Sequence, residues 1–65
     1  MKKKAKIEIG QLRLWTESVW KDKQFLVIER FTDFNQKMLK VLQNNRIIVV
    51  TESVAYRMSD VIEDS

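Results

Sequence analysis

The 65-residue sequence predicts a mainly β fold, in which five strands form a small barrel and a short helical turn precedes the last strand. Three observations predict this class. Polar and apolar residues alternate over residues 6–15, which is typical of a strand with one buried face. The runs 25–31 and 46–51 are rich in β-branched and aromatic residues. Asn44-Asn45 precedes the second of these runs, where asparagine suits a two-residue hairpin turn.

The first predicted strand spans residues 6–15 and bends at Gly10, because a lone glycine inside an alternating pattern indicates a bulge or a bend. Residues 16–23 are polar apart from two side chains, so we expect a long loop there with Trp20 folded back onto the body. The run 25–31 predicts the second strand, buried on most of both faces.

Residues 34–43 fit two structures. An N-cap pattern followed by apolar residues at helical spacing supports an α+β fold with a helix over 34–43. The alternative is a strand over 37–43 that turns through Asn44-Asn45 into the strand 46–51. We favour the hairpin, because the apolar strand after the turn needs a neighbour.

The C-terminal part of the chain predicts a helical turn and a closing strand. Residues 52–58 form the turn of helix, with Thr51 or Ser53 as its N-cap. Ser59-Asp60 then makes a turn, and residues 61–63 form the short last strand.

One four-residue sequence, Thr-Glu-Ser-Val, occurs both at 16–19 and at 51–54. One interpretation is a duplication that left two equivalent loops facing a partner. The other is coincidence, because threonine and serine are common where strands end. A single match of this length does not establish a repeat.

The net charge of +3 is carried by one end of the chain. Residues 1–6 hold four lysines and no acid, whereas residues 7–65 hold 8 basic and 9 acidic residues, a sum of −1. The chain is too short for a second core. We therefore divide it into a basic arm over 1–6 and a single barrel domain over 7–65.

The composition excludes several classes of function. Cysteine and histidine are both absent, which rules out disulfides and His- or Cys-based catalytic triads and leaves no ordinary zinc ligand set. No motif pairs two carboxylates or forms a glycine-rich phosphate loop, so we expect neither an enzyme, a cofactor nor a small-molecule substrate.

The sequence also argues against a membrane location. No apolar run is longer than the four residues of 47–50, which is far shorter than the roughly 20 residues of a membrane span. The lysine-rich start leads into alternating residues rather than the apolar stretch of a signal peptide. We expect a cytoplasmic protein, in keeping with the absence of cysteine.

The order of these elements resembles the SH3-like small barrel, the layout of SH3, KOW and Tudor-type modules. The segments that carry the resemblance are 10–15, the loop with Trp20, 25–30, the hairpin at Asn44-Asn45 and 54–63. The layout is similar to that of short SH3-like proteins of phages and mobile elements, which implies a modulator or inhibitor of a host protein. The single glycine departs from KOW modules, and the acidic loop and Trp-Trp pattern of peptide-binding SH3 domains are absent. We therefore infer neither the ligand of KOW modules nor the peptide ligand of SH3 domains for this chain.

We expect a non-catalytic binding module, with a protein as its partner. Several residues near the predicted loop and helical turn are types favoured at interface centres or suited to a basic partner. They are Trp20, Tyr56, Arg57, Met58 and Asp60. A homo-oligomer is a further alternative, because edge strands of an open barrel can pair with a second copy.

The alternative function is nucleic-acid binding, in which lysines neutralise phosphates and aromatic rings stack on bases. The candidate residues are Lys2, Lys3, Lys4, Lys6, Arg13, Trp15, Lys21 and Lys23. The nearly neutral body argues against a wide electrostatic footprint, and in so short a chain at least one tryptophan is needed for the core.

Overall fold

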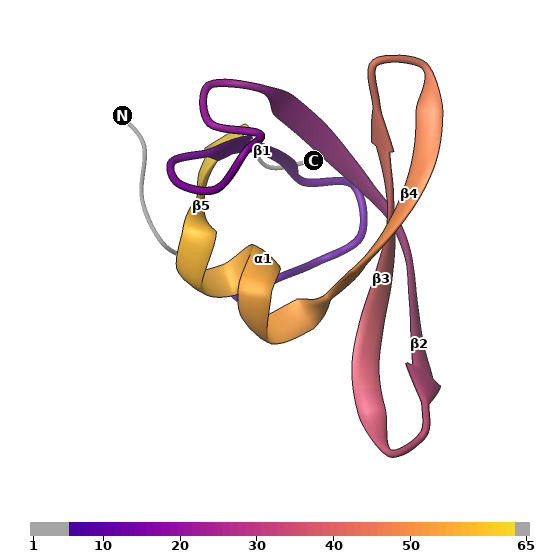
Figure 1. The fold of residues 1–65 in the computed structure, drawn as a ribbon. Coiled ribbons are helices and arrows are strands. Elements are labelled where there is room, and N and C mark those ends of the chain that lie inside the picture. Colours follow the sequence, from indigo (N-terminus) through magenta and orange to yellow (C-terminus); the bar gives the residue numbers. More distant parts are fainter. Residues whose placement is uncertain (1–5, 64–65) are drawn as a thin grey trace.

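The computed structural model describes residues 6–63, which form one five-stranded antiparallel sheet and one short helix (Figure 1). The elements are β1 (Leu12–Trp15), β2 (Gln24–Asp33), β3 (Gln36–Gln43), β4 (Arg46–Thr51), α1 (Glu52–Met58) and β5 (Ser59–Glu63). The strand order is β4-β3-β2-β1-β5. The mainly β class and the helix before the last strand are thus confirmed. The sheet has β4 and β5 as its edges, so the predicted closure into a barrel is not a feature of this sheet.

The first strand is shorter than predicted. β1 begins at Leu12, because Gly10 lies in a turn with φ 93° and the Gln11 amide donates to the Glu8 carbonyl at 3.3 Å. The segment before β1 is still attached to the sheet. The Gly10 amide donates to the Val27 carbonyl at 2.8 Å, and the Val27 amide donates to the Gln11 carbonyl at 3.0 Å.

The hairpin alternative is correct for residues 34–43, and the helix is wrong. β3 pairs with β2 on one side and β4 on the other. Asn44 and Asn45 have φ 54° and 62°, the left-handed values that a type I′ turn requires. Backbone pairing with two neighbouring strands, together with burial of Leu39 and Val41 in the core, outweighs the weak helical spacing of this segment.

The β2–β3 ladder contains a bulge at Ile28. Val27 pairs with Val41 and Glu29 pairs with Lys40, so β2 contains one residue more than β3 over this step of the ladder. The extra residue reverses the alternation of β2. Val27 faces the core, and Arg30 faces the same side three residues later.

The core lies between the inner face of the sheet and α1. Its largest members are Trp15, Phe25 and Ile7, each at most 1% exposed. Ala55 is the residue of α1 that is fully buried against this cluster. Trp20 folds back as predicted, with its ring 5.1 Å from that of Trp15.

The last two elements follow without a break. Thr51 is the N-cap of α1 and its hydroxyl accepts from the Val54 amide at 3.3 Å, which confirms one of the two predicted caps. The predicted turn at Ser59-Asp60 is wrong, because both residues pair with β1 and begin β5. The Thr-Glu-Ser-Val segments fold differently: 16–19 lies in the β1–β2 loop, whereas 51–54 starts the helix.

Candidate functional site

The inner face of β1 is polar at its centre. Gln11 and Arg13 are buried with Trp15, while Leu12 and Leu14 lie half-buried on the outer face. Arg13 and Trp15 are both 0% exposed, so neither can offer a surface to a nucleic acid in this structure. The Trp15 indole instead donates to Gln43 Oε1 at 2.7 Å.

Arg13 belongs to a buried chain of hydrogen bonds, which we call the polar chain. Gln11 Nε2 donates to the Lys6 carbonyl at 2.8 Å, and Gln11 Oε1 accepts from Arg13 Nη1 at 3.0 Å. Arg13 Nε donates to Ser59 Oγ at 2.8 Å, and Arg13 Nη2 donates to the Ser59 carbonyl at 3.0 Å. The Ser59 hydroxyl donates to the Ala55 carbonyl in α1. The polar chain therefore joins the segment before β1 to the helix through the interior.

An open groove lies between these two joined parts and the tip of the β2–β3 hairpin. It has a volume of about 720 Å³. A smaller hollow of about 310 Å³, lined by Arg30, continues from it and shares Lys37 and Glu52. We call the two together the α1 groove. The residues that line the larger part are Lys6, Ile7, Asn35, Lys37, Glu52, Ser53 and Tyr56.

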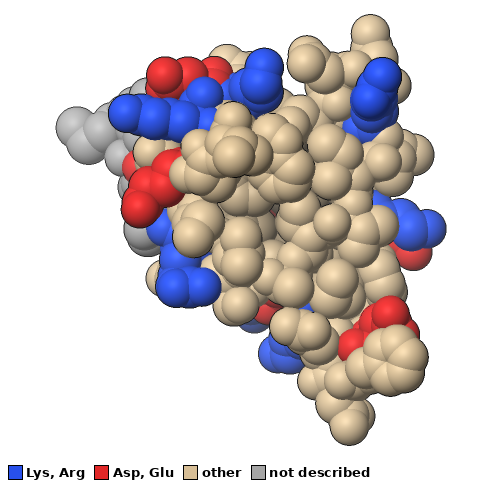
Figure 2. Space-filling model, viewed as in Figure 1, with Lys and Arg blue, Asp and Glu red and all other residues tan. Residues whose placement is uncertain are grey.

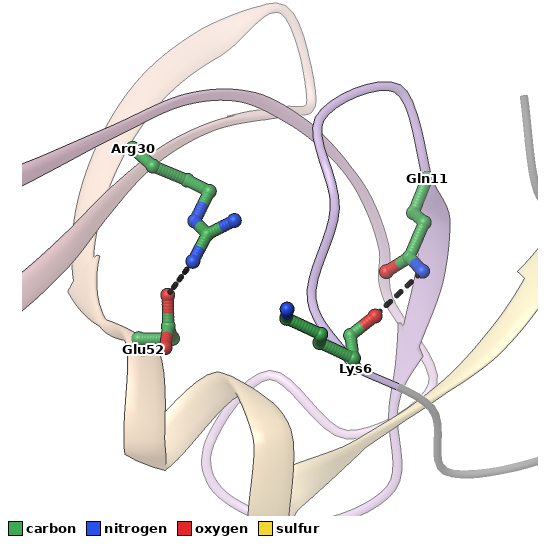
Figure 3. A network of polar contacts seen from close by, with 4 residues as sticks. All are labelled: Lys6, Gln11, Arg30 and Glu52. Carbon is green, nitrogen blue, oxygen red and sulfur yellow. Dashed lines mark hydrogen bonds and ion pairs between the residues drawn. The ribbon is translucent and has the colours of Figure 1, made fainter.

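Three cations from separate segments converge on the α1 groove. Arg30 Nη2 pairs with Glu52 Oε2 at 3.2 Å, and both side chains are partly exposed. Figure 3 shows the Lys6 ammonium extending toward the Arg30 guanidinium from the opposite wall. Among residues 6–63 no ion pair involves the ammonium of Lys6 or that of Lys37. The groove thus holds three positive charges and one negative charge.

Arg30 and Lys37 reach the α1 groove because the β2–β3 hairpin extends beyond the apolar core. Along the inner face of β3, Val41 and Leu39 are buried and Lys37 is exposed. Figure 1 shows the far end of the β2–β3 hairpin extending past α1. The bulge at Ile28 turns Arg30 toward the same side. These residues lie beyond the apolar core, where a charged side chain can reach water.

A second open cleft lies at the opposite end of the hairpins, and we call it the Trp20 cleft. It has a volume of about 430 Å³. Its lining residues are Trp20, Lys23, Gln43, Asn44, Arg46 and Ile48. It brings predicted residues of both functions together, because Trp20 was a protein-binding candidate and Lys23 a nucleic-acid candidate. The sequence did not single out Arg46, which the β3–β4 turn places beside them.

The outer face of the sheet carries a continuous apolar row. Ile47 pairs with Leu42, Leu42 with Leu26, and Leu26 with Leu12, so the row crosses four strands. Exposure rises toward the β4 edge: Leu42 in β3 is 38% exposed and Ile47 in β4 is 62% exposed. Val49, the next outward residue of β4, is 50% exposed.

The backbone of β4 is unpaired on its outer side. The residues that flank a two-residue hairpin turn form a hydrogen-bonded pair, and such pairs then alternate along the ladder. Arg46, Ile48 and Val50 therefore bond to β3, while the amide and carbonyl groups of Ile47 and Val49 point to the free edge. In the described part of the chain, no backbone hydrogen bond outside the ladder reaches Ile47 or Val49.

The remaining predicted site residues are scattered. Tyr56 lines the α1 groove and is 42% exposed. Met58 packs against the core, Asp60 is half-buried in β5, and Arg57 is exposed on α1. Lys21 is exposed in the β1–β2 loop and lines none of the three hollows. Lys2, Lys3 and Lys4 lie outside the described residues.

Neither a metal-binding cluster nor a membrane-spanning helix occurs among residues 6–63. No three acidic side chains gather closely enough to hold a metal ion. The single described helix is too short to cross a membrane. Comparison of the chain with protein-family models, curated proteins and solved structures found no match.

Proposed function

We propose that the protein is a non-catalytic module that binds another protein by accepting a strand at the free edge of β4. The observation that supports this best is the coincidence at Ile47 and Val49 of unpaired backbone groups with exposed apolar side chains. A partner strand there would gain backbone hydrogen bonds, and its side chains would extend the apolar row. An edge strand that exposes both is otherwise an aggregation hazard.

The finer fold is also part of the proposal. The order β4-β3-β2-β1-β5, with a short helix between β4 and β5, supports an SH3-like small barrel that is open between its edge strands. In this view α1 covers one end of the core, and the edge of β4 remains free. Such a layout offers an edge and two clefts to a partner while needing no catalytic group.

The distribution of charge favours a protein over a nucleic acid. Figure 2 shows basic and acidic side chains interspersed around the margin of one face, whose centre is uncharged. A nucleic-acid footprint usually gathers lysines and arginines on one surface. Arg13 and Trp15 are buried, so the body loses two of its expected nucleic-acid contacts.

The test compares Val49→Glu with the matched variant Val19→Glu. Both replace an exposed valine by the same acid, but Val19 lies in the β1–β2 loop at 90% exposure. The carboxylate introduced by Val49→Glu would lie opposite Lys40, so the fold should tolerate it. We expect Val49→Glu to reduce capture of the specific partner from a nuclease-treated lysate of the source cell by about tenfold or more. Quantitative mass spectrometry measures the capture, and Val19→Glu should match the wild type.

Equal capture by the two variants would rule out strand addition at β4. The same experiment tests the nucleic-acid alternative, which the Trp20 cleft with Lys23 and Arg46 supports. In that case nuclease would abolish capture. Binding would also fall steeply between roughly 50 and 200 mM salt and would be lost on deletion of residues 1–6.

A further inference from the structure

We propose that the α1 groove binds an acidic peptide segment, whose carboxylate or phosphate group is held between Lys6, Arg30 and Lys37. This surface is separate from the outward face of β4, and the proposal does not depend on strand addition there. The segment can belong to the partner that docks at β4 or to another protein.

The first support is the balance of charge. Two ammonium groups and one guanidinium face one groove, and the single carboxylate, Glu52, already pairs with Arg30 at 3.2 Å. Like charges that face one another raise the free energy unless an anion lies between them. Lys6 and Lys37 make no ion pair in the described chain, so their donors are available to a ligand. Charge-assisted hydrogen bonds to a carboxylate or phosphate are the strong ones.

The second support is that the walls are fixed before a ligand arrives. Gln11 holds the Lys6 carbonyl, and Arg13 links Gln11 to Ser59 at the end of α1. Gln11, Arg13 and Ser59 are at most 2% exposed. They are positioning residues, which set the wall that carries Lys6 against the wall formed by α1. A preorganised groove loses less entropy on binding than one that must form around its ligand.

The third support is the size and chemistry of the lining. A volume of about 720 Å³ exceeds what a single small anion fills and falls in the range of sites for larger ligands. Ile7 and Tyr56 supply apolar surface, while Asn35 and Ser53 can bond to peptide groups. The lining therefore suits a short run of peptide with an acidic side chain.

Phe34, the sequence neighbour of the lining residue Asn35, adds an independent observation. It precedes Asn35 in the β2–β3 turn, is 94% exposed and has φ 50°. A bulky residue with a positive φ costs folding free energy. The exposed ring of Phe34 makes too little packing contact to offset that cost. An exposed aromatic ring on the residue next to Asn35, which lines the groove, is a suitable anchor for a bound peptide.

The presence of Glu52 favours a peptide over a nucleic acid. Its carboxylate lies among the cations, where it would repel the repeated phosphates of a nucleic-acid strand. A peptide has one or two acidic groups and several backbone amides, and Glu52 and Asn35 can accept from those amides.

The experiment titrates the full chain with defined probes, using calorimetry and amide chemical shifts. The probes are a blocked tetraglutamate peptide, a blocked peptide with one phosphoserine, inorganic phosphate, and oligothymidine. Lys37→Gln is compared with Lys21→Gln, which makes the same change of charge in the β1–β2 loop outside the groove. Phe34→Ala tests whether the exposed ring contributes to peptide binding. Circular dichroism melting confirms that each variant is folded.

We expect saturable binding of at least one acidic peptide, with shift changes at Lys6, Arg30 and Tyr56. Lys37→Gln should weaken it about tenfold and Lys21→Gln less than about twofold. The two peptides distinguish a carboxylate from a phosphate as the group that is bound. No saturation by either peptide would overturn the proposal. So would equal weakening by the two lysine variants, or tighter binding of inorganic phosphate or oligothymidine than of both peptides.

Discussion

Arg13 is a cation at the centre of the molecule, and the hydrogen bonds of its guanidinium replace the water that it loses on folding. It donates to Gln11 and Ser59 through three nitrogens, and it is 0% exposed. Burying a charge is costly unless its hydrogen bonds are satisfied. The consequence is that Arg13 acts on the α1 groove from within, by fixing the residues that shape it.

Replacing Arg13 by methionine should destabilise the protein by about 3 kcal/mol. Methionine fills much of the same volume but leaves Gln11 Oε1 and the Ser59 oxygens without the donors that they have in the native fold. Urea denaturation measures the free energy of unfolding. Arg46→Met is the matched control, because Arg46 is exposed in β4 and should change stability by less than about 0.5 kcal/mol. Similar losses of unfolding free energy in the two variants would contradict this role of Arg13.

The sequence could show that Gln11, Arg13 and Trp15 share one face of the predicted first strand, but not which face is buried. Alternation places Leu12 and Leu14 on the other face, and two leucines would ordinarily define the inside. The structure buries the face with Trp15, because that ring stacks on Phe25 at 4.4 Å and anchors the core. Arg13, which the sequence suggested as a surface residue, therefore lies in the interior.

At the scale of elements, the two hairpin turns use the same backbone shape with different residues. Asn44-Asn45 and Phe34-Asn35 all have φ between 50° and 62°. Asparagine tolerates this region and phenylalanine does not. The β2–β3 turn is therefore less favourable than the β3–β4 turn, although both join well-paired strands.

Phe34→Asn should stabilise the protein by about 1 kcal/mol, because it relieves the unfavourable φ and sacrifices almost no packing. For a chain of this size that gain raises the melting temperature by about 4–8 °C. Phe34→Ala separates the effect of the ring from the effect of the backbone conformation, since alanine removes the ring but keeps a Cβ at positive φ. It should leave the melting temperature nearly unchanged. A loss of stability in Phe34→Asn would show that the ring packs in solution.

The elements were predictable to different degrees. The hairpin at Asn44-Asn45 could be found because the turn residues and the apolar run agree. The bulge at Ile28 could not, since no glycine or change of pattern marks it, and it decides the side to which Arg30 points. The α1 groove was missed for this reason. A usable signal was the inner face of β3, where the charged Lys37 precedes the apolar Leu39 and Val41.

At the scale of the whole molecule, the segment before β1 belongs to the sheet although it is not a strand. The Gly10 amide bonds to Val27 in the middle of β2, and the Lys6 carbonyl is held by buried Gln11. Breaking these contacts exposes the centre of the core, so we expect this segment to open only when the whole protein unfolds.

Native-state hydrogen exchange measures this directly. The Gly10 amide should exchange with the same free energy of opening as the Leu39 amide in β3, which is paired with a strand on each side. The Val19 amide, in the exposed β1–β2 loop, should exchange far faster and serves as the internal control. Exchange of Gly10 at the loop rate would contradict a single cooperative unit.

The polar chain also determines how a ligand bound in the α1 groove would change the free energy of unfolding. Because one interior network holds the wall that carries Lys6 and the wall formed by α1, we expect these walls and the core to be lost together. A ligand in the groove then opposes complete unfolding. A ligand at about 100 times its dissociation constant then adds about 2.7 kcal/mol to the free energy of unfolding. On a chain this small, that addition raises the melting temperature by more than about 10 °C. A thermal-shift screen of peptide libraries can therefore find the occupant of the groove even when its sequence is unknown at the start.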